Sequence, residues 1–428
     1  MIEICARVGY VRSTVAMVSA HAGVSTASFY EQFDSKEACL LAACRLASQR
    51  ILPDMPSSNE PARGQRATLR RVLGDVLGAW QRDLDAGWLL FAGALAAGAD
   101  ARAERTLAIA RFERSLEGLL EASPEPLDLP AGALTGALCA LAFGALREPR
   151  KAPLSVLLDD LLAWTFSYAL PEGASRSSAG GGMAVTRAPG DSRRPALDAY
   201  SPAAPCLPRG RHRLTPQQVA RVHRTRIIHG VAQATLEKGY AELTVRDIVA
   251  SAQIARGVFY EHFADKHDAF LAAQRGCNIE LLRVCSRAYF ASGSWPERVW
   301  GTLATLTALI TANPALARLP LIESYAAGAA AIEATEDLCS VLPIFLFEGY
   351  AYAVQGDRLP ASRADCVAGA VFELVRRDIG EGDLAALCGR LPQIAYLALA
   401  PFTGAPEAHR LVAELSARDP DPLAERTA

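Results

Sequence analysis

The spacing of apolar residues along the chain predicts α-helices almost throughout. Apolar side chains recur every three or four positions, as one face of a helix requires, in segments such as 63–83, 102–122 and 295–312. No stretch alternates apolar and polar residues for long enough to indicate a sheet. The pattern therefore predicts an all-α fold.

One long segment interrupts this helical pattern. Residues 171–213 are rich in Gly, Pro, Ser, Ala and Arg and poor in large apolar side chains. Such a composition cannot build a core and is typical of a flexible linker. The segment divides the 428 residues into two halves, each long enough to bury a core of its own.

A repeat relates the two halves. Residues 9–43 align without a gap onto residues 239–273, with a constant offset of 230 and fourteen identities in thirty-five positions. A repeat spaced so widely indicates a duplicated module. We call the two occurrences copy one and copy two.

Each copy has the pattern of two short helices joined by a tight turn. Thr14 and Thr244 stand where a helix N-cap belongs, because an apolar run at helical spacing follows each of them. Two sets of residues fall on one face of this helix and should be buried: Val15, Val18 and Ala22 in copy one, and Val245, Ile248 and Ala252 in copy two.

The turn and the next helix follow directly in copy one. Gly23 suits the positive φ of a turn, and Ser25 suits the N-cap of the following helix. Phe29 and Phe33 then lie one helical turn apart, so we expect both rings in the core.

Copy two departs from this pattern at its turn. Gln253 stands where copy one has Gly23, and Ala255 stands in place of the capping Ser25. Each change should cost about 1 kcal/mol if the backbone is the same. A sharp turn is therefore less strongly specified in copy two.

The strings AGVSTASFYEQFDSKEACLLAA and AQIARGVFYEHFADKHDAFLAA resemble the helix-turn-helix of TetR-type transcriptional regulators, whose hallmark is Phe-Tyr-x-x-Phe followed by Ser or Asp and then Lys. The resemblance implies two tandem units, each a helix-turn-helix DNA-binding domain followed by a helical ligand-binding and dimerisation domain. The expected DNA-binding domains are residues 1–46 and 214–275, and the expected effector domains are residues 47–170 and 276–417.

The resemblance also assigns residues to the DNA contact. Those expected to face the groove are Thr26, Ala27, Tyr30, Arg256, Gly257 and Tyr260. Those expected to face phosphates are Thr14, Gln32, Lys36, Thr244, His262 and Lys266. Residue chemistry adds Arg246 to the expected DNA contacts and gives a second reason to expect one from Arg256. Two hydrogen bonds from one arginine to guanine are the commonest base contact.

Charge separates the two copies. The whole chain has a formal net charge of −2, so any attraction to DNA must be local. Residues 207–275 hold eleven Lys and Arg against six Asp and Glu, whereas residues 1–50 hold five against four. Copy two therefore has the stronger electrostatic footprint for a phosphate backbone.

Copy one has a short start. Only eight residues precede Gly9, whereas a helix from about Thr215 to Lys238 is predicted before Gly239. Two explanations are open: the true start lies upstream, or the first unit has decayed. Both copies could therefore bind DNA, or only the second could bind it while the first serves dimerisation or ligand sensing. A helical ligand-binding protein without affinity for DNA is the third alternative.

The resemblance implies a ligand-responsive repressor whose partners are double-stranded operator DNA and an unidentified small-molecule effector. The two halves could pair within one chain as a pseudo-dimer or between chains as a homodimer. The sequence suggests no cofactor. The ten cysteines and seven histidines are scattered without metal-ligand or catalytic spacing. We expect reduced thiols, a cytoplasmic location without a membrane span, no metal site and no enzymatic activity.

Overall fold

The computed structural model describes residues 1–52, 64–121, 126–147, 153–170, 215–291, 293–353, 360, 362–382 and 384–418. These residues form helices and turns, and their one β-interaction is an isolated bridge between Leu127 and Ala169. The predicted all-α fold is confirmed. The expected linker, 171–213, lies outside the described residues.

The first half contains nine α-helices and a 3-10 turn among its described residues. In chain order they are α1 (Ile2–Val8), α2 (Val15–Ala22), α3 (Thr26–Gln32), α4 (Lys36–Ile51), α5 (Gln65–Arg82), α6 (Leu84–Phe91), η1 (Gly93–Ala96), α7 (Ala99–Glu121), α8 (Ala131–Arg147) and α9 (Leu154–Phe166).

The second half repeats this order with more interruptions. Its elements are α10 (Pro216–Glu242), α11 (Val245–Ala252), α12 (Arg256–His262), α13 (Lys266–Tyr289), α14 (Trp295–Ala312), α15 (Ala315–Arg318), the π-helical turn η4 (Leu319–Glu323), α16 (Ser324–Ala327), α17 (Ala329–Val341), the 3-10 turn η5 (Leu342–Leu346), α18 (Gly349–Tyr352), α19 (Arg363–Glu381), α20 (Leu384–Gly389), α21 (Leu391–Thr403) and α22 (Ala405–Arg418).

The duplication extends well beyond the segment in which the sequence reveals it. Helices α5 and α14 differ in position by the same 230 residues, and each ends at a residue with φ −136°: Asp83 (ψ 79°) and Asn313 (ψ 83°). Further on, Gly98 and Gly328 share positive φ values of 96° and 106°. Gly328 also separates α16 from α17. The backbone of the two halves is therefore still similar in this region, although their side chains no longer are.

The two halves pack against each other through α8 and α19. A Cβ built on Gly136 would lie 2.5 Å from the carbonyl oxygen of Gly369, and one built on Gly369 would lie 2.7 Å from that of Gly136. The helices therefore cross with their backbones almost in contact, at a point where each half contributes a glycine.

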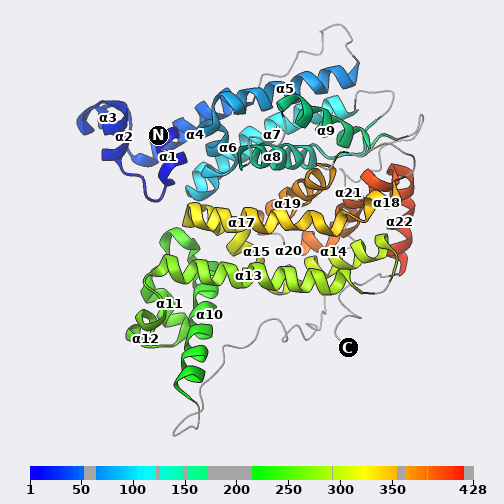
Figure 1. The fold of residues 1–428 in the computed structure, drawn as a ribbon. Helices are drawn as coiled ribbons and strands as arrows, with labels where there is room; N and C mark the ends of the chain where they lie inside the picture. Colours follow the sequence, from blue (N-terminus) through cyan, green and yellow to red (C-terminus); the bar gives the residue numbers. More distant parts are fainter. Residues whose placement is uncertain are drawn as a thin grey trace.

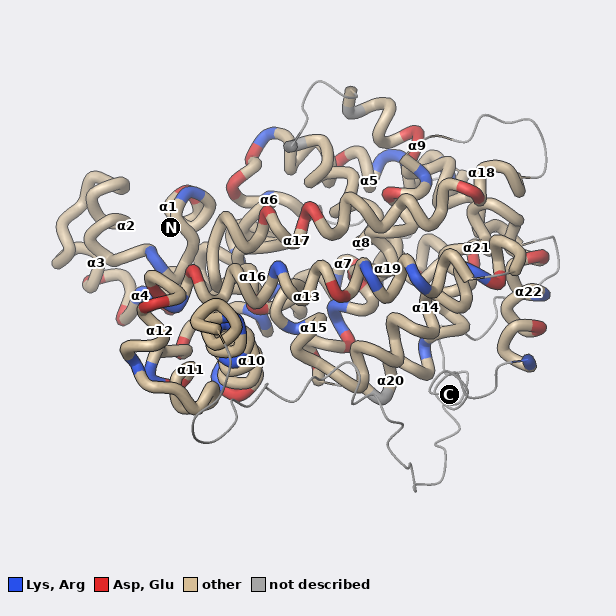
Figure 2. The backbone as a smooth tube through the Cα atoms, turned by 60° about the horizontal axis from the view of Figure 1, so that its bottom comes forward, with Lys and Arg blue, Asp and Glu red and all other residues tan. Residues whose placement is uncertain are grey.

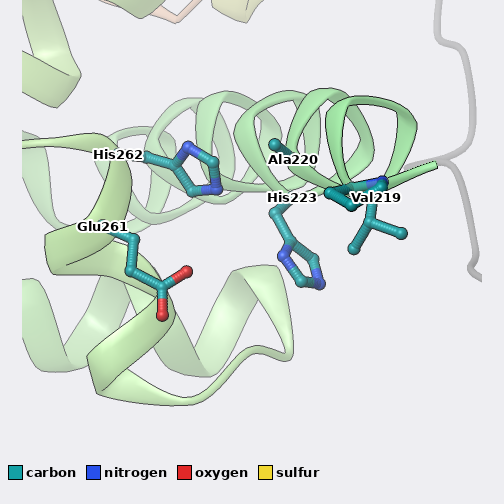
Figure 3. Close-up of a pocket in the computed structure, with 6 residues that line it drawn as sticks. Val219, Ala220, His223, Glu261 and His262 are labelled. Carbon is teal, nitrogen blue, oxygen red and sulfur yellow. The ribbon is translucent and has the colours of Figure 1, made fainter.

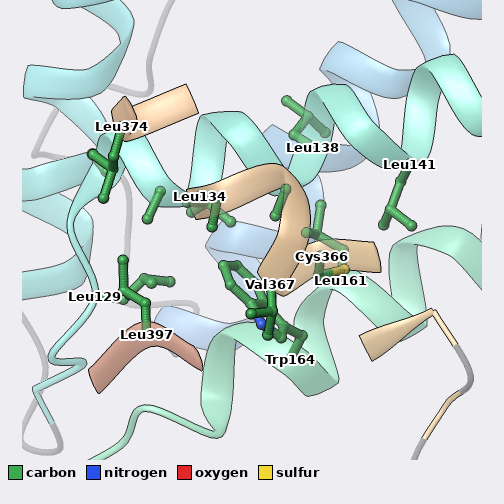
Figure 4. Close-up of a cluster of buried hydrophobic side chains, with 14 of the residues drawn as sticks. Leu129, Leu134, Leu138, Leu141, Leu161, Trp164, Cys366, Val367, Leu374 and Leu397 are labelled. Atoms are coloured by element: carbon green, nitrogen blue, oxygen red, sulfur yellow. The ribbon is translucent and has the colours of Figure 1, made fainter. Parts of the chain in front are cut away.

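Apolar side chains from both halves fill the space around this crossing. Figure 4 shows Leu134 and Leu138 of α8, Trp164 of α9 and Val367 of α19 in one buried cluster. Deeper in the same interface, the Tyr168 hydroxyl donates a hydrogen bond of 2.8 Å to the carbonyl of Leu397. A single continuous core thus joins the halves.

The pairing places both helix-turn-helix segments at one end of the molecule. In Figure 1, α2 and α3 lie at the upper left and α11 and α12 at the lower left, and Figure 2 shows the same end from another direction. The helices of the interface lie toward the other end.

Candidate DNA-binding site

We call residues 1–46 head one and residues 214–275 head two, the latter described from residue 215. In head one, the hydroxyl of Thr14 accepts a hydrogen bond of 3.2 Å from the amide of Met17, and that of Ser25 accepts one of 3.0 Å from the amide of Ser28. Between these caps, Gly23 has φ 69° and ψ 26°. The structure confirms the predicted caps and the positive-φ turn of copy one.

Head two forms the same turn with different residues. Gln253 has φ 52° and ψ 50°, and it is the one non-glycine residue with positive φ in the described part of the chain. Ala255 supplies no side-chain cap to α12. At the start of α11, Thr244 and Asp247 form a reciprocal capping box. The turn that seemed weakly specified is therefore present.

Arg226 of α10 stabilises this turn from outside the repeated segment. Its guanidinium donates hydrogen bonds to the carbonyls of Ala252 (3.1 Å) and Gln253 (2.8 Å), at the C-terminal end of α11. A cation there satisfies carbonyls that the helix leaves unpaired and opposes the negative end of its dipole. Sequence reasoning missed Arg226, although a basic residue in the bracing helix was visible.

An ion pair stabilises the start of α11. Lys238 contacts the carboxylate of Asp247 at 2.6 Å. The hydrogen bonds from Lys238 and Thr244 lower the pKa of Asp247 from 3.8 to about 2. The carboxylate stays charged above that pH and so holds the capping box closed.

The helices predicted to read DNA present their expected side chains to solvent. Tyr30 of α3 is 54% exposed and Tyr260 of α12 is 47% exposed. The other expected contacts that are exposed are Thr14, Thr26, Ala27, Gln32, Thr244, Arg246, Arg256 and Gly257. The two heads thus offer equivalent surfaces with different side chains.

Arg256 and Tyr260 form a unit on α12. A guanidinium nitrogen of Arg256 donates a 3.3 Å hydrogen bond to the Tyr260 hydroxyl, and the guanidinium lies 5.6 Å from the ring centroid. The pair holds two donors side by side on the exposed face. Head one has Thr26 at the position of Arg256, so it has no cation there.

The lysines expected to face phosphates have partners within the protein. The Lys36 ammonium donates to the carbonyls of Tyr10 (3.2 Å) and Ser13 (3.0 Å), and Lys266 donates to those of Tyr240 (3.2 Å) and Leu243 (2.9 Å). Burial lowers the pKa of both lysines. Since an ammonium has three protons, one remains for a phosphate. The phosphate contact stays a prediction. The hydrogen bonds to the carbonyls show that each lysine stabilises the segment just before α2 or α11.

His262 borders a pocket at the edge of head two. The pocket encloses about 310 Å³ and is lined by Pro216, Val219, Ala220, His223, Glu261 and His262. Figure 3 shows His223 and His262 facing the same opening, with ring centroids 6.1 Å apart. Burial and the neighbouring His223 lower the pKa of His262. A phosphate contact by His262 remains a prediction.

The core of head one is smaller than the sequence predicts. Ala22 and Phe33 were both expected to be buried, but Ala22 is exposed and Phe33 only half-buried, whereas Ala252 and Phe263 in head two are buried. The reason is α10: its Gly230 packs on Ala252, and its Arg224 lies over the Phe263 ring at 4.5 Å. The seven residues of α1 do not extend to these positions.

Comparison with known families identifies both segments. Residues 2–43 and 227–273 match the family model described as bacterial regulatory proteins, tetR family. Two segments of the chain thus match the same tetR-family model, and the match covers the caps, the turn and the exposed helix of each head.

Several solved structures are similar to part of the chain. FadR, a fatty acid degradation regulator from Bacillus halodurans, is 18% identical, with a TM-score of 0.37 over 41% of this chain and 96% of its own. FadR from Bacillus subtilis, in complex with stearoyl-CoA, is 15% identical, with a TM-score of 0.37 over 41% and 97%. A TetR-like regulator from Rhodococcus sp. RHA1 is 15% identical, with a TM-score of 0.34 over 44% and 99%. Curated protein sequences yielded no match.

The second matched segment is linked by a carboxylate to the helices that follow it. Glu323 of η4 accepts a 2.8 Å hydrogen bond from the amide of Tyr240, just after the kink at Gly239. Arg318 contacts the same carboxylate at 3.3 Å. The residue 230 positions earlier than Glu323 is Gly93, which cannot make this contact for the first domain.

Within the described part of the chain, no group of three or more His, Cys, Asp or Glu residues is placed to hold a metal ion. No single helix there is long and apolar enough to cross a membrane. The segments Trp295–Ala312 and Ala315–Ala327 reach that length and composition only together, and they are bent by 104°.

Proposed function

We propose that this chain is a cytoplasmic, ligand-responsive repressor that reads one operator with two unequal heads. The observation that carries the proposal is the presence of two exposed recognition helices, α3 and α12, at the same end of one paired molecule (Figure 1). Regulators with paired helix-turn-helix units place two such helices in successive major grooves of a palindrome. Here one chain supplies both.

The two halves of such an operator should differ in sequence. Arg246 and Arg256 give head two donors that can fork onto guanine, whereas head one has Ala16 and Thr26 at the equivalent positions. Small side chains favour contact with a thymine methyl group. We expect a G-rich half-site for head two and a half-site without that preference for head one.

Repression would be relieved by an effector bound among the helices that follow each head. A ligand acts only through its different affinity for two states, one of which has the heads wrongly spaced for DNA. The Glu323 contact with Tyr240 gives head two a direct path to this region. An effector should therefore move head two more than head one.

A second candidate function has only head two binding DNA, with head one serving dimerisation or ligand sensing. It is favoured by the absence of a cation in head one at the position of Arg256, where Thr26 stands. In that case a single half-site would account for the whole affinity.

A gel-shift titration of matched variants separates these candidates. Tyr30→Ala and Tyr260→Ala remove the same exposed ring from each head. Phe290→Ala removes an exposed ring just past the end of α13 and is the control. Comparable losses of affinity in both heads support the two-headed repressor. A loss confined to Tyr260→Ala supports the second candidate. Binding to random duplex that is absent at both low and moderate salt contradicts DNA reading altogether.

A further inference from the structure

A buried network of charges lies across the interface between the halves. It joins Arg105 and Glu113 of α7, in the first half, to Glu373, Arg376 and Arg377 of α19, in the second. Four of the five side chains are buried, and Arg377 is partly so. A charge in such a place is tolerated only when it is paired.

The pairing crosses from one half to the other at two points. The Arg377 guanidinium forms a two-pronged contact with Glu113, in which one hydrogen bond measures 2.7 Å. Arg105 approaches Glu373 at 3.8 Å, while Arg376 binds the same carboxylate at 2.5 Å. Burial alone would raise the pKa of Glu373, but the surrounding guanidinium groups lower it to about 2.

The two halves are related by an approximate two-fold axis that passes through the crossing of α8 and α19. The glycines at this crossing show which residues of the two halves are equivalent. A Cβ on Gly136 would lie 2.7 Å from the Cβ of Glu373, and one on Gly369 would lie 2.4 Å from that of Ala140. These are the same contact seen from each half, with an offset of 233 residues between α8 and α19. Glu373 therefore corresponds to Ala140.

The same offset makes Arg376 and Arg377 equivalent to Phe143 and Gly144. For α7 the offset is 230, as fixed by the paired glycines at 98 and 328, so Arg105 and Glu113 correspond to Thr335 and Pro343. None of these five counterparts carries a charge. The interface is therefore charged on one side of its axis and uncharged on the other.

We propose that this one-sided network makes the two halves of a single chain each other's partner and rejects pairing of either half with its own copy. The first half supplies Glu113, the carboxylate that Arg377 contacts in addition to Glu373 of its own helix, and the second half supplies Glu373, which Arg105 approaches. The inference concerns protein pairing and goes beyond DNA reading, so each can fail without the other.

Pairing of like halves would leave the buried charges unbalanced. Two second halves would set Arg377 against Pro343, so that Arg376 and Arg377 share the single carboxylate of Glu373. Two first halves would set Glu113 against Gly144, with no cation opposite it. Arg105 and Glu113 cannot substitute for these partners by pairing with each other, because eight residues separate them by about 12 Å along α7. Unpaired buried charges disfavour association strongly.

A double-mutant cycle on the full chain tests the proposal. Glu113→Gln and Arg377→Met should each lower the folding equilibrium constant roughly ten- to a hundred-fold, measured by denaturant unfolding. The double variant should lose much less than the product of the two, because it leaves neither charge unpaired. The control cycle uses Glu280 and Arg283, an exposed pair within α13, and should change the constant by less than about five-fold.

Sedimentation equilibrium of the unaltered protein completes the test. The expected result is the mass of one chain, 45.6 kDa, at every concentration. Coupling between Glu113 and Arg377 together with that mass supports the proposal. Independent effects of the two substitutions, or a species of two chains, would overturn it.

Discussion

Heads one and two form the same turn, but different residues stabilise it. In head one the turn is specified locally, by Gly23 with φ 69° and by the cap at Ser25. In head two the corresponding residues are unsuited to these tasks, and Arg226 of α10 supplies the stabilisation instead. The comparison teaches that a helix-turn-helix can take its geometry either from its own residues or from its brace.

The brace itself is the largest difference between the heads. Helix α10 has 27 residues and α1 has 7. The longer helix covers Ala252 and Phe263, and the shorter one leaves the equivalent Ala22 and Phe33 in contact with solvent. Head one should therefore open more readily than head two, since local stability follows buried apolar contact.

Gly230→Val should produce the largest effect, because it separates head two from its brace. A Cβ at Gly230 would lie 2.7 Å from the Cβ of Ala252 and 2.8 Å from the carbonyl oxygen of Ile248. The backbone of α11 would therefore have to move away from α10. We expect a loss of about 3 kcal/mol in the local stability of head two, measured by amide hydrogen exchange in α11 and α12.

Two controls accompany this substitution. Gly276→Val, in α13, meets no atom within 4 Å and should leave exchange in head two unchanged. Exchange in α2 and α3 should also stay as it was. A similar loss of protection in both heads would mean that the brace acts on the whole molecule.

Arg226→Ala should have the next largest effect. It removes two charge-assisted hydrogen bonds from the end of α11 and should cost head two about 1 to 2 kcal/mol. Arg221→Ala removes an exposed charge from the same helix and is the matched control. Equal effects of the two variants would show that Arg226 acts only through general charge.

A reciprocal exchange of the turn residues should give a smaller, opposite pair of changes. Gln253→Gly relieves a side chain held at positive φ and should stabilise head two by up to about 1 kcal/mol. Gly23→Gln should cost head one about as much. Thermal unfolding monitored within each head checks both signs, and a loss in head two would show that the Gln253 side chain makes a compensating contact.

The smallest effect is a response to acid in head two alone. The pKa of Asp247 is about 2 in the folded protein, below its ordinary 3.8, so its contribution is present above pH 3.8 and is lost as pH falls toward 2. Head one has Met17 at this position and should not respond. Lys238→Ala should raise the pKa of Asp247, as measured by NMR titration. An unchanged pKa would show that Lys238 does not lower it.

The sequence predicts the features that adjacent residues determine. The caps at Thr14, Thr244 and Ser25 and the turn at Gly23 all follow from short-range patterns. The all-α fold follows from apolar spacing. These features need no knowledge of how distant segments pack.

Features that depend on distant segments could not be predicted in the same way. Nothing local to Gln253 reveals that Arg226 caps its carbonyl. Nothing local to Lys36 reveals that its ammonium donates hydrogen bonds to the carbonyls of Tyr10 and Ser13. The exposure of Ala22 depends on the length of a helix outside the repeated segment. DNA contacts by the nominated residues remain predictions, because they involve a partner molecule.

The crossing of α8 and α19 within one chain has a consequence for how such a regulator responds to its own abundance. Separate subunits must meet before they can read a palindrome, so the supply of competent dimers falls faster than the number of subunits when a cell makes few of them. Halves joined covalently meet at an effective concentration set by the connecting chain. Each chain would then be competent once folded, and occupancy of the operator would follow expression in direct proportion down to a few molecules per cell.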